Sequence, residues 1–420
     1  MKKFLFLAII FFLASKVYSE KKLLKWIDLL KMANENNQKI LASLYEIKAI
    51  NSENYIYLSK FFPKIESGFQ LKFLKQNSAD FAKNYSFDIS LNQLLFDGLK
   101  TLYDYKKSKK NLEIAKYNYR LISATVRLNL RLAYIEYLRA KNLLKITEEI
   151  AKRNEINLEA VKIRYKNGRE HKGSLLTMEA NLEKIKTELK QIERSVELAK
   201  LKILKEIGVD NLNEYEIDDK IDITNINEIM IKEPEYEEII DNNFELRMKI
   251  LSKELAELNL KSAKASFFPS IYFNFSCGRN FAENSPVNKN ISFGFSISLP
   301  LFESGARVAE IYKAKYYLLK FEAEERDKKY ELILNAKNYW INYQNSIENI
   351  KVQKNFLEAA QTRAKIAFIQ YSTGILSFDN WLIIENENIN IQNSYLESLI
   401  NALKAEAYWD YIKGVTLDEI

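Results

Sequence analysis

The residue types that most often perform chemistry are scarce in this sequence. Its 420 residues include one histidine, His171, and one cysteine, Cys277. Zinc sites, Cys/His dyads and Ser-His-Asp triads depend on these two residue types, so a single copy of each leaves too few partners. His171 lies in a polar run and is predicted to be a solvated loop residue without a functional role. We therefore predict that the protein is not an enzyme and has no catalytic residue, metal site or cofactor.

The composition favours long, uninterrupted helices. The chain has only 10 glycines and 5 prolines, with 47% hydrophobic and 28% charged residues. Its net charge of +7 comes from 63 basic and 56 acidic residues mixed along the chain, without the basic block typical of a nucleic-acid interface. We therefore expect solvated helix surfaces and no nucleic-acid partner.

The N-terminus is typical of an export signal. Two lysines precede an apolar stretch (4–14), and Ser19 stands at a small-residue position before a predicted cleavage at Glu20. Because Glu20 rather than a cysteine follows the cut, we expect no acylation. No later segment has the ~18 uninterrupted apolar residues of a transmembrane helix. A mature chain in a membrane would therefore cross it as strands.

The chain contains an internal duplication. Phe61-Phe62-Pro63 recurs as Phe267-Phe268-Pro269, and 267 − 61 gives an offset of 206. The same offset relates Asn36-Asn37 to Asn242-Asn243, Phe96 to Phe302, Tyr165 to Tyr371 and Gly168 to Gly374. Chance matches would not keep one offset, so we predict two repeats. The predicted domains are a signal peptide (1–19), a first repeat (20–206), an acidic linker (207–236), a second repeat (237–413) and a tail (414–420).

Each repeat has the same predicted order of elements. A helix (23–60; 236–266) ends at Phe-Phe-Pro, because proline disfavours the α conformation of the residue before it. Two strands follow, with polar loops (77–78; 284–286) joining them into hairpins. The next run lacks glycine and proline; from Leu99 to Lys166 it has 68 residues, which as a helix would measure ~100 Å. A helix of this length must pack lengthwise against partners, as in a coiled coil or helical barrel. A further helix then returns in each repeat (175–207; 378–413).

The predicted strands have one apolar and one polar face. Large apolar residues alternate with small polar ones at Tyr85, Phe87, Ile89 and Leu91, and again at Ile291, Phe293, Phe295, Ile297 and Leu299. One interpretation is an ordinary sheet with one face on a core and the other in water. The other is a membrane barrel with its apolar face, including Cys277, toward lipid and its polar face toward a water-filled lumen.

The export signal, the long helices and the missing helical span favour the barrel. Four strands cannot close one, since the smallest bacterial barrels have about eight. Open strand edges are not tolerated in lipid, so several subunits must contribute strands.

An ordered set of motifs occurs in both repeats. It consists of Glu35-Asn36-Asn37, the Phe-Phe-Pro strand entries, the strand exits Leu-Phe-Asp-Gly and Leu-Phe-Glu-Ser-Gly, and the helix-end runs at 164–168 and 370–377. With these motifs the chain resembles the TolC-like outer-membrane efflux proteins, from roughly Leu23 to Gly414. The resemblance implies a mainly α fold with a small β part, built from duplicated long-helix hairpins plus two β-hairpins per chain. Three such chains would form an α-helical barrel across the periplasm and a 12-stranded transmembrane β-barrel.

The resemblance also implies roles for residues at the helix-hairpin tips. Tyr165, Gly168, Tyr371, Gly374 and Ser377 would lie at the periplasmic entrance, where the adaptor of an inner-membrane pump docks. Both glycines also suit left-handed helix C-caps, and the two roles are compatible. The first tip has a longer turn, which argues against identical docking at the two tips.

A candidate entrance gate follows the second tip. Family members often carry acidic residues six and nine positions after the second tip glycine, as a ring that narrows the closed entrance. Those positions are Asn380 and Ile383 here, and Asp379 stands beside them. An alternative is that Asp379 only complements the helix dipole in the first turn after a Ser377 N-cap.

The predicted function is an outer-membrane channel subunit, the passive exit duct of a tripartite efflux or type I secretion system. Its predicted partners are two further copies of itself, a periplasmic adaptor, an inner-membrane pump and outer-membrane lipid. The alternative is a periplasmic coiled-coil scaffold or adaptor protein with a small water-soluble sheet.

Overall fold

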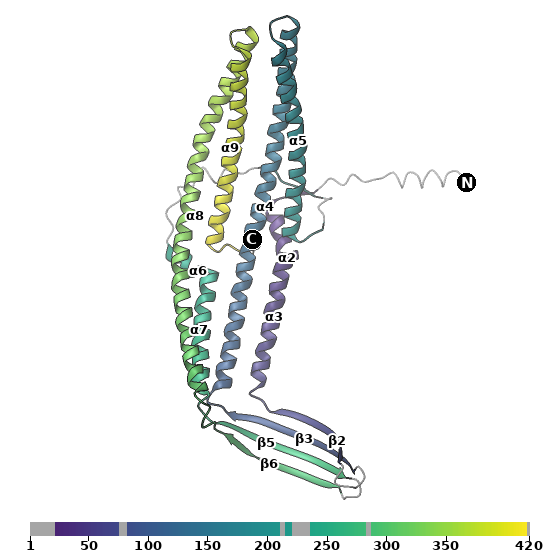
Figure 1. Cartoon of the computed structure of the whole chain (residues 1–420), viewed down its shortest axis with the longest axis vertical. Helices are drawn as coiled ribbons and strands as arrows, with labels where there is room; N and C mark the ends of the chain where they lie inside the picture. Colours follow the sequence, from purple (N-terminus) through teal and green to yellow (C-terminus); the bar gives the residue numbers. More distant parts are fainter. Residues whose placement is uncertain (1–21, 75–81, 211–214, 221–235, 283–286, 418–420) are drawn as a thin grey trace, which may run out of the picture. The chain divides into compact units, whose positions relative to one another are not determined.

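The computed structural model describes residues 22–74, 82–210, 215–220, 236–282 and 287–417 (Figure 1). The described chain is mainly helical with a small β part, as predicted. The helices are α2 (Trp26–Asn36), α3 (Gln38–Ser59), α4 (Lys100–Lys166), α5 (Lys172–Ile207), α6 (Tyr236–Asn242), α7 (Phe244–Ala265), α8 (Ala306–Thr373) and α9 (Phe378–Ile412). The strands are β1 (Lys22–Leu24), β2 (Lys64–Leu74), β3 (Ala82–Phe96), β4 (Tyr215–Ile217), β5 (Ser270–Ala282) and β6 (Asn288–Ser298).

Several predicted segments lie outside the described residues. They are the signal peptide, the loops at 77–78 and 284–286, most of the 207–236 linker and the end of the tail. Within the described chain, no helix is both long enough and apolar enough to cross a membrane.

Contacts divide the chain into two compact units. The hairpin unit comprises residues 1–41, 122–235 and 335–420, and the sheet unit comprises residues 42–121 and 236–334. Each unit contains a part of α4 and a part of α8.

The sheet unit contains an antiparallel sheet in the order β2-β3-β5-β6. The strands form the two predicted hairpins, β2 with β3 and β5 with β6, and β3 pairs with β5 between them. The strand predicted to reach Leu299 ends at Ser298, so Leu299 lies just outside β6. In this register the odd-numbered residues share one face and the even-numbered residues share the other.

The odd-numbered face is apolar except for Lys83, Arg279 and Lys289 near its loop end, and no described residue covers it. On β6, the exposed fractions are 70% for Ile291, 78% for Phe293 and 71% for Phe295. Cys277 belongs to this face, where it pairs with Ile89 and Ile291. A contiguous apolar surface of this kind marks a site of interaction with protein or membrane.

The even-numbered face is polar and carries small side chains. One of its rows is Gly68, Asp88, Gly278 and Asn290. The Asp88 carboxylate lies over Gly68, because a Cβ on that glycine would be 2.9 Å from Asp88 Oδ1. The glycines on both sides of Asp88 leave its carboxylate accessible from this face.

The turns from sheet to helix repeat with the duplication offset. Between β3 and α4, Gly98 and Leu99 both have φ of +70°, while between β6 and α8, Ser304 has +49° and Gly305 has +84°. Positions 98 and 304 differ by the offset of 206, so both repeats have two consecutive residues in the left-handed conformation. The glycine is the first residue of the pair in the first repeat and the second residue in the second repeat. A non-glycine residue in this region costs on the order of 1–3 kcal/mol. Both long helices therefore leave the sheet through the same strained turn.

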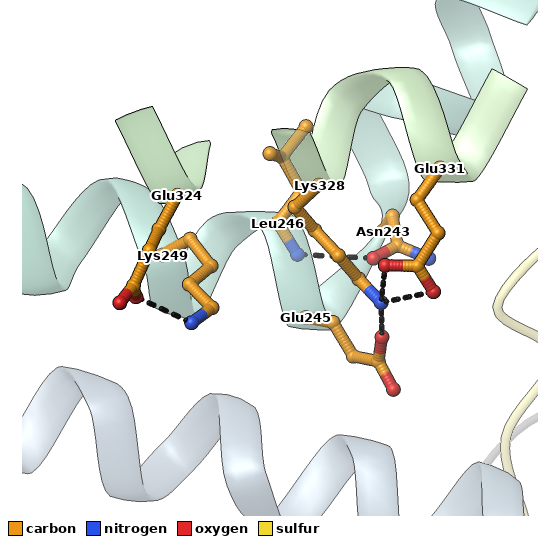
Figure 2. A network of polar contacts seen from close by, with 7 residues as sticks. All are labelled: Asn243, Glu245, Leu246, Lys249, Glu324, Lys328 and Glu331. Carbon is orange, nitrogen blue, oxygen red and sulfur yellow. Dashed lines mark hydrogen bonds and ion pairs between the residues drawn. The ribbon is translucent and has the colours of Figure 1, made fainter. Parts of the chain in front are cut away.

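Ion pairs align α7 on α8 inside the sheet unit (Figure 2). Lys328 of α8 contacts Glu245 of α7, and Lys249 of α7 donates to Glu324 of α8 at 2.8 Å. The hydrogen bond with Glu245, together with one to a carboxylate on its own helix, outweighs burial and raises the pKa of Lys328. These charges stay paired at neutral pH and set the register of the two helices.

Two predicted helices are each interrupted by an asparagine. The helix predicted at 23–60 is divided into α2 and α3 at Asn37, and the one predicted at 236–266 into α6 and α7 at Asn243. Both asparagines have extended backbone, and their Oδ1 atoms accept hydrogen bonds from the amides of Ile40 (3.3 Å) and Leu246 (3.0 Å; Figure 2). The prediction of continuous helices is wrong because an asparagine side chain competes with the helix for these amides.

The first helix also begins later than predicted. Residues Lys22–Leu24 form β1, which pairs in parallel with β4, and α2 starts at Trp26 instead of residue 23. Three-residue strands are too short to show an alternation of apolar and polar residues, so the sequence did not reveal this pair.

The end of α5 packs closely against the break after α2. Gly208 has φ of +71°, and a Cβ at this position would lie 2.2 Å from the Asn36 carbonyl oxygen. Asn37 Nδ2 donates to the Glu206 carbonyl at 2.7 Å. Only glycine fits this backbone contact within the hairpin unit.

The core of the hairpin unit is shared by both helix hairpins. It includes Leu158 of α4, Met178 of α5, Tyr371 of α8 and Trp381 of α9. Four ion pairs also connect α4 with α9: Arg131–Glu406, Glu136–Lys404, Arg139–Glu397 and Arg153–Glu385. Burial acts to raise the pKa of Glu136, but the hydrogen bond from Lys404 at 2.6 Å prevails and lowers it. These contacts bind the two halves of the duplication together.

Candidate functional site

Each helix hairpin ends in the same type of turn. Gly168 after α4 and Gly374 after α8 have φ of +68° and +84°, which confirms the predicted left-handed caps. The Arg169 amide donates to the Arg164 carbonyl at 2.9 Å, and the equivalent bond at the second turn is also 2.9 Å. These bonds define Schellman motifs. A Cβ on either glycine would meet no atom within 4 Å, so only the backbone angle demands glycine.

The return helices begin at side-chain caps. α5 starts at Lys172, earlier than the predicted residue 175, because the side chain of His171 accepts a hydrogen bond from the Ser174 amide at 3.3 Å. His171 is exposed in the turn, as predicted, and in addition it caps α5. Ser377 accepts from the Asn380 amide at 3.4 Å, as expected of the predicted N-cap. The first turn spans residues 167–171 and the second spans 374–377, so the first is the longer, as predicted.

Tyr371 is the centre of a contact between the two tips. Its side chain is almost fully buried, with 1% exposed, and its ring stacks on Trp381 at 4.5 Å between centroids. Its hydroxyl donates to Glu170 Oε2 at 3.1 Å, and Glu170 belongs to the turn of the other hairpin. Burial and then the negative charge of Glu170 raise the pKa of Tyr371, so the phenol stays a proton donor at physiological pH.

Arg164, near the end of α4, forms a second contact between the tips. Its guanidinium lies 4.7 Å from the centroid of the Tyr371 ring, a cation–π geometry. It also donates to the carbonyls of Tyr371 at 3.0 Å and Ser372 at 3.3 Å. These carbonyls are at the negative end of α8, where a cation is favourable. The first tip therefore provides an arginine and a glutamate that both bind one tyrosine of the second tip.

The predicted docking residues fall into two groups. Tyr165, Gly168, Gly374 and Ser377 are exposed, whereas Tyr371 is buried. Tyr371 can thus affect a partner only by positioning the turn after it.

The candidate gate residues lie on the exposed side of α9. Asp379, Asn380 and Ile383 are all exposed, and Asp379 is in the first turn of the helix. Phe378 and Trp381 point to the opposite side, into the core. The described part of the chain places no partner on the gate side.

The acidic residues that follow are already paired. Glu387 accepts a hydrogen bond from Arg363 at 2.7 Å. Glu385 is buried beside Arg153, whose Nε lies 2.7 Å from Glu385 Oε1 without hydrogen-bond geometry. Burial raises the pKa of Glu385 more than the charge of Arg153 lowers it. Neither carboxylate is free to line an entrance in the way that Asp379 is.

Comparison with known proteins extends this description. A family model for the outer membrane efflux protein matches residues 29–209 and 236–380, well over half of the chain. The chain belongs to the outer membrane efflux protein family. As a member of this family it is an outer-membrane channel protein and not an enzyme, as predicted, and the scaffold alternative is not favoured.

Solved structures show the same fold at low sequence identity. A Pseudomonas aeruginosa membrane protein has a TM-score of 0.83 and 16% identity, with 92% of each chain covered. The Campylobacter jejuni CmeC outer membrane channel has a TM-score of 0.82 and 14% identity, covering 93% of this chain and 86% of that one. VceC from Vibrio cholerae has a TM-score of 0.80 and 15% identity, covering 93% and 96%. A search of curated proteins finds no match.

Proposed function

We propose that the protein is one subunit of a homotrimeric exit duct that carries solutes out through the periplasm and the outer membrane. The observation that carries this proposal is a sheet with an uncovered apolar face and two open edges, β2 and β6. Each edge strand has 11 residues, within the ~9–11 that a tilted strand needs to span a bilayer. Open edges in lipid must be paired, and three copies of four strands would close a 12-stranded barrel.

The helices beside the two open edges support the same assembly. α3 leads into β2 and exposes Tyr45 (64%) and Tyr55 (66%), while α8 follows β6 and exposes Tyr312 (53%) and Tyr316 (65%). Large aromatic side chains left uncovered on both flanks of the sheet unit are typical of an interface between subunits. In the proposed trimer, the α3 flank of one copy packs against the α8 flank of the next.

Each segment of the chain has a place in this assembly. The signal peptide (1–19) directs export and is removed, the two repeats (20–206 and 237–413) each contribute a β-hairpin and a helix hairpin, and the 207–236 linker and 414–420 tail complete the chain. The energy for transport comes from an inner-membrane pump, reached through a periplasmic adaptor. The system is either a tripartite efflux or a type I secretion system.

The tips form the adaptor-docking surface at the periplasmic entrance. Tyr165, Gly168, Gly374 and Ser377 present exposed turn surfaces to the adaptor, and Tyr371 positions the second turn from its buried site. Asp379, with Asn380 and Ile383, lines the entrance, because these residues share the free side of α9. The contacts of Tyr371 with Arg164 and Glu170 keep the two tips together and the entrance narrow.

Native mass spectrometry of the detergent-extracted protein tests the assembly. We expect a mass of three mature chains, without a lipid-sized increment on the N-terminus. A stable monomer that remains inserted in the membrane would refute the shared barrel, and release of the protein from membranes by alkali would instead support the scaffold alternative.

A further inference from the structure

We propose that Arg279 and Lys289, at the loop end of the apolar sheet face, bind the phosphate of an anionic lipid headgroup. The inference rests on the proposed function, because it requires the odd-numbered face to lie against lipid. It adds a binding site for a phosphate group to a surface that is otherwise apolar.

The strand register places the two cations side by side. Arg279 of β5 pairs directly with Lys289 of β6 and, on its other side, with Phe87 of β3. Side chains at directly opposite positions of antiparallel strands have Cβ atoms about 4.5–5.5 Å apart. Both side chains are exposed, so both can reach one ligand in front of the sheet.

Nothing in the described sheet neutralises this pair. The described strands β2, β3, β5 and β6 contain two acidic residues, Glu66 and Asp88, and both lie on the even-numbered face. Like charges opposite each other destabilise a sheet unless a counterion joins them. The pair is therefore arranged for an anion that the described strands do not supply.

The position of the pair on the face indicates the kind of anion. Towards the helices, the next row consists of Ser67, Ile89, Cys277 and Ile291, and the row after it of Ile65, Leu91, Phe275 and Phe293. Neither row has a charge, so from the helix side Arg279 and Lys289 form the border at which charge first appears on β5 and β6, one row before Phe281. At such a border the acyl chains of a lipid end and its headgroup begins.

The chemistry of the two side chains suits a phosphate. A guanidinium binds two phosphate oxygens with parallel hydrogen bonds, and an ammonium adds a compact second charge. The adjoining Ile291 and Phe293, exposed at 70% and 78%, offer a surface for the acyl chains of the same molecule. A headgroup with attached chains therefore fits this place better than free phosphate.

The test uses the full mature channel, reconstituted in nanodiscs of phosphatidylcholine with a minor fraction of phosphatidylglycerol. After gentle removal of the disc, native mass spectrometry counts the lipids of each kind retained on the protein. We expect the wild-type channel to retain phosphatidylglycerol preferentially. In the double variant Arg279→Gln, Lys289→Gln the preference should fall roughly thirtyfold, from the attraction of two basic side chains at a membrane surface.

Lys72→Gln is the matched control. Lys72 is also exposed and near the loop end, but it lies on the even-numbered face. We expect this variant to retain the wild-type preference. An equal loss in the control would overturn the proposal, because the effect would then follow net charge alone.

Further outcomes separate this proposal from the proposed function. If the wild-type channel is a trimer but shows no preference for phosphatidylglycerol, the lipid site is overturned and the exit duct is not. This outcome is read from the wild-type channel alone, so it does not depend on whether a variant folds. Displacement of the lipid by millimolar inorganic phosphate would assign the site to free phosphate instead. A protein that does not form a trimer in the same spectra overturns both.

Discussion

Replacing Tyr371 by phenylalanine would remove one contact between the hairpin tips and leave the aromatic core in place. The lost contact is the 3.1 Å hydrogen bond from the phenol to Glu170, while the ring can still stack on Trp381. A hydrogen bond to a charged group contributes ~1.5–3 kcal/mol, and the partial exposure of Glu170 favours the lower end. A loss of ~1.5 kcal/mol corresponds to a roughly tenfold larger population of separated tips in each subunit.

Single-channel conductance in planar bilayers measures this population. We expect Tyr371→Phe to spend more time at high conductance than the wild-type channel, with an unchanged yield of trimer. Tyr165→Phe is the matched control, because Tyr165 lies at the equivalent place of the first repeat and its side chain is 39% exposed. Its phenol has no hydrogen bond to the described residues, so its conductance should not change.

Two results would contradict this reasoning. If Tyr371→Phe conducts like the wild type while thermal unfolding shows an intact hairpin unit, the contact with Glu170 does not restrict the entrance. If Tyr165→Phe opens the channel equally, the effect does not depend on the contact between the tips.

Three further predictions concern other parts of the chain. Gly374→Val should impair export more than trimer assembly, because it adds only backbone strain of ~1–2 kcal/mol. Gly208→Val should instead abolish folding, since its Cβ would lie 2.2 Å from a backbone oxygen. For both variants, immunoblots measure the amount of trimer in the membrane, and efflux is measured in the same cells. The raised pKa of Glu385 means that the protonated side chain favours the folded state. Its contribution to stability is present below the ordinary carboxyl range and is lost as pH rises through the raised pKa. The lowered pKa of Glu136 has the opposite effect: its contribution to stability is present above the ordinary carboxyl range and is lost as pH falls through the lowered pKa. Melting temperatures measured from neutral pH down through the ordinary carboxyl range should therefore show that Glu385→Gln removes a gain on acidification and that Glu136→Gln removes a loss. Equal slopes in both variants would contradict the assignment. Asp88→Asn should reduce the preference of the channel for cations, measured as the reversal potential in a salt gradient, because Asp88 is the carboxylate left accessible between two glycines on the polar face.

The repeated architecture could be predicted because it depends on local patterns. The alternation from Tyr85 to Leu91 predicts a strand wherever the chain places it, and the run without glycine or proline after Leu99 predicts a helix. The interruptions at Asn37 and Asn243 could not be predicted from the same patterns. Both residues stand in otherwise periodic segments, and the break arises from hydrogen bonds that their side chains make with the next turn.

The tip contact was beyond sequence analysis for a different reason. Tyr371 and Glu170 are separated by 201 positions, and no periodic signal relates residues so far apart. The offset of 206 correctly pairs Tyr165 with Tyr371 but suggests that they have the same environment. In the structure one is exposed and the other is buried.

This difference shows how the duplication has diverged at the tips. Arg164 and Glu170 of the first repeat correspond, at the offset of 206, to Gln370 and Leu376 of the second, which carry no charge. The first tip thus supplies the charged groups, and the second supplies the buried tyrosine that receives them. Because Gln370 and Leu376 carry no charge, the second tip cannot make the reciprocal contact with Tyr165. It follows that the two tips cannot be exchanged: a change at Tyr371 loosens the contact from the receiving side, whereas a change at Tyr165 leaves it untouched.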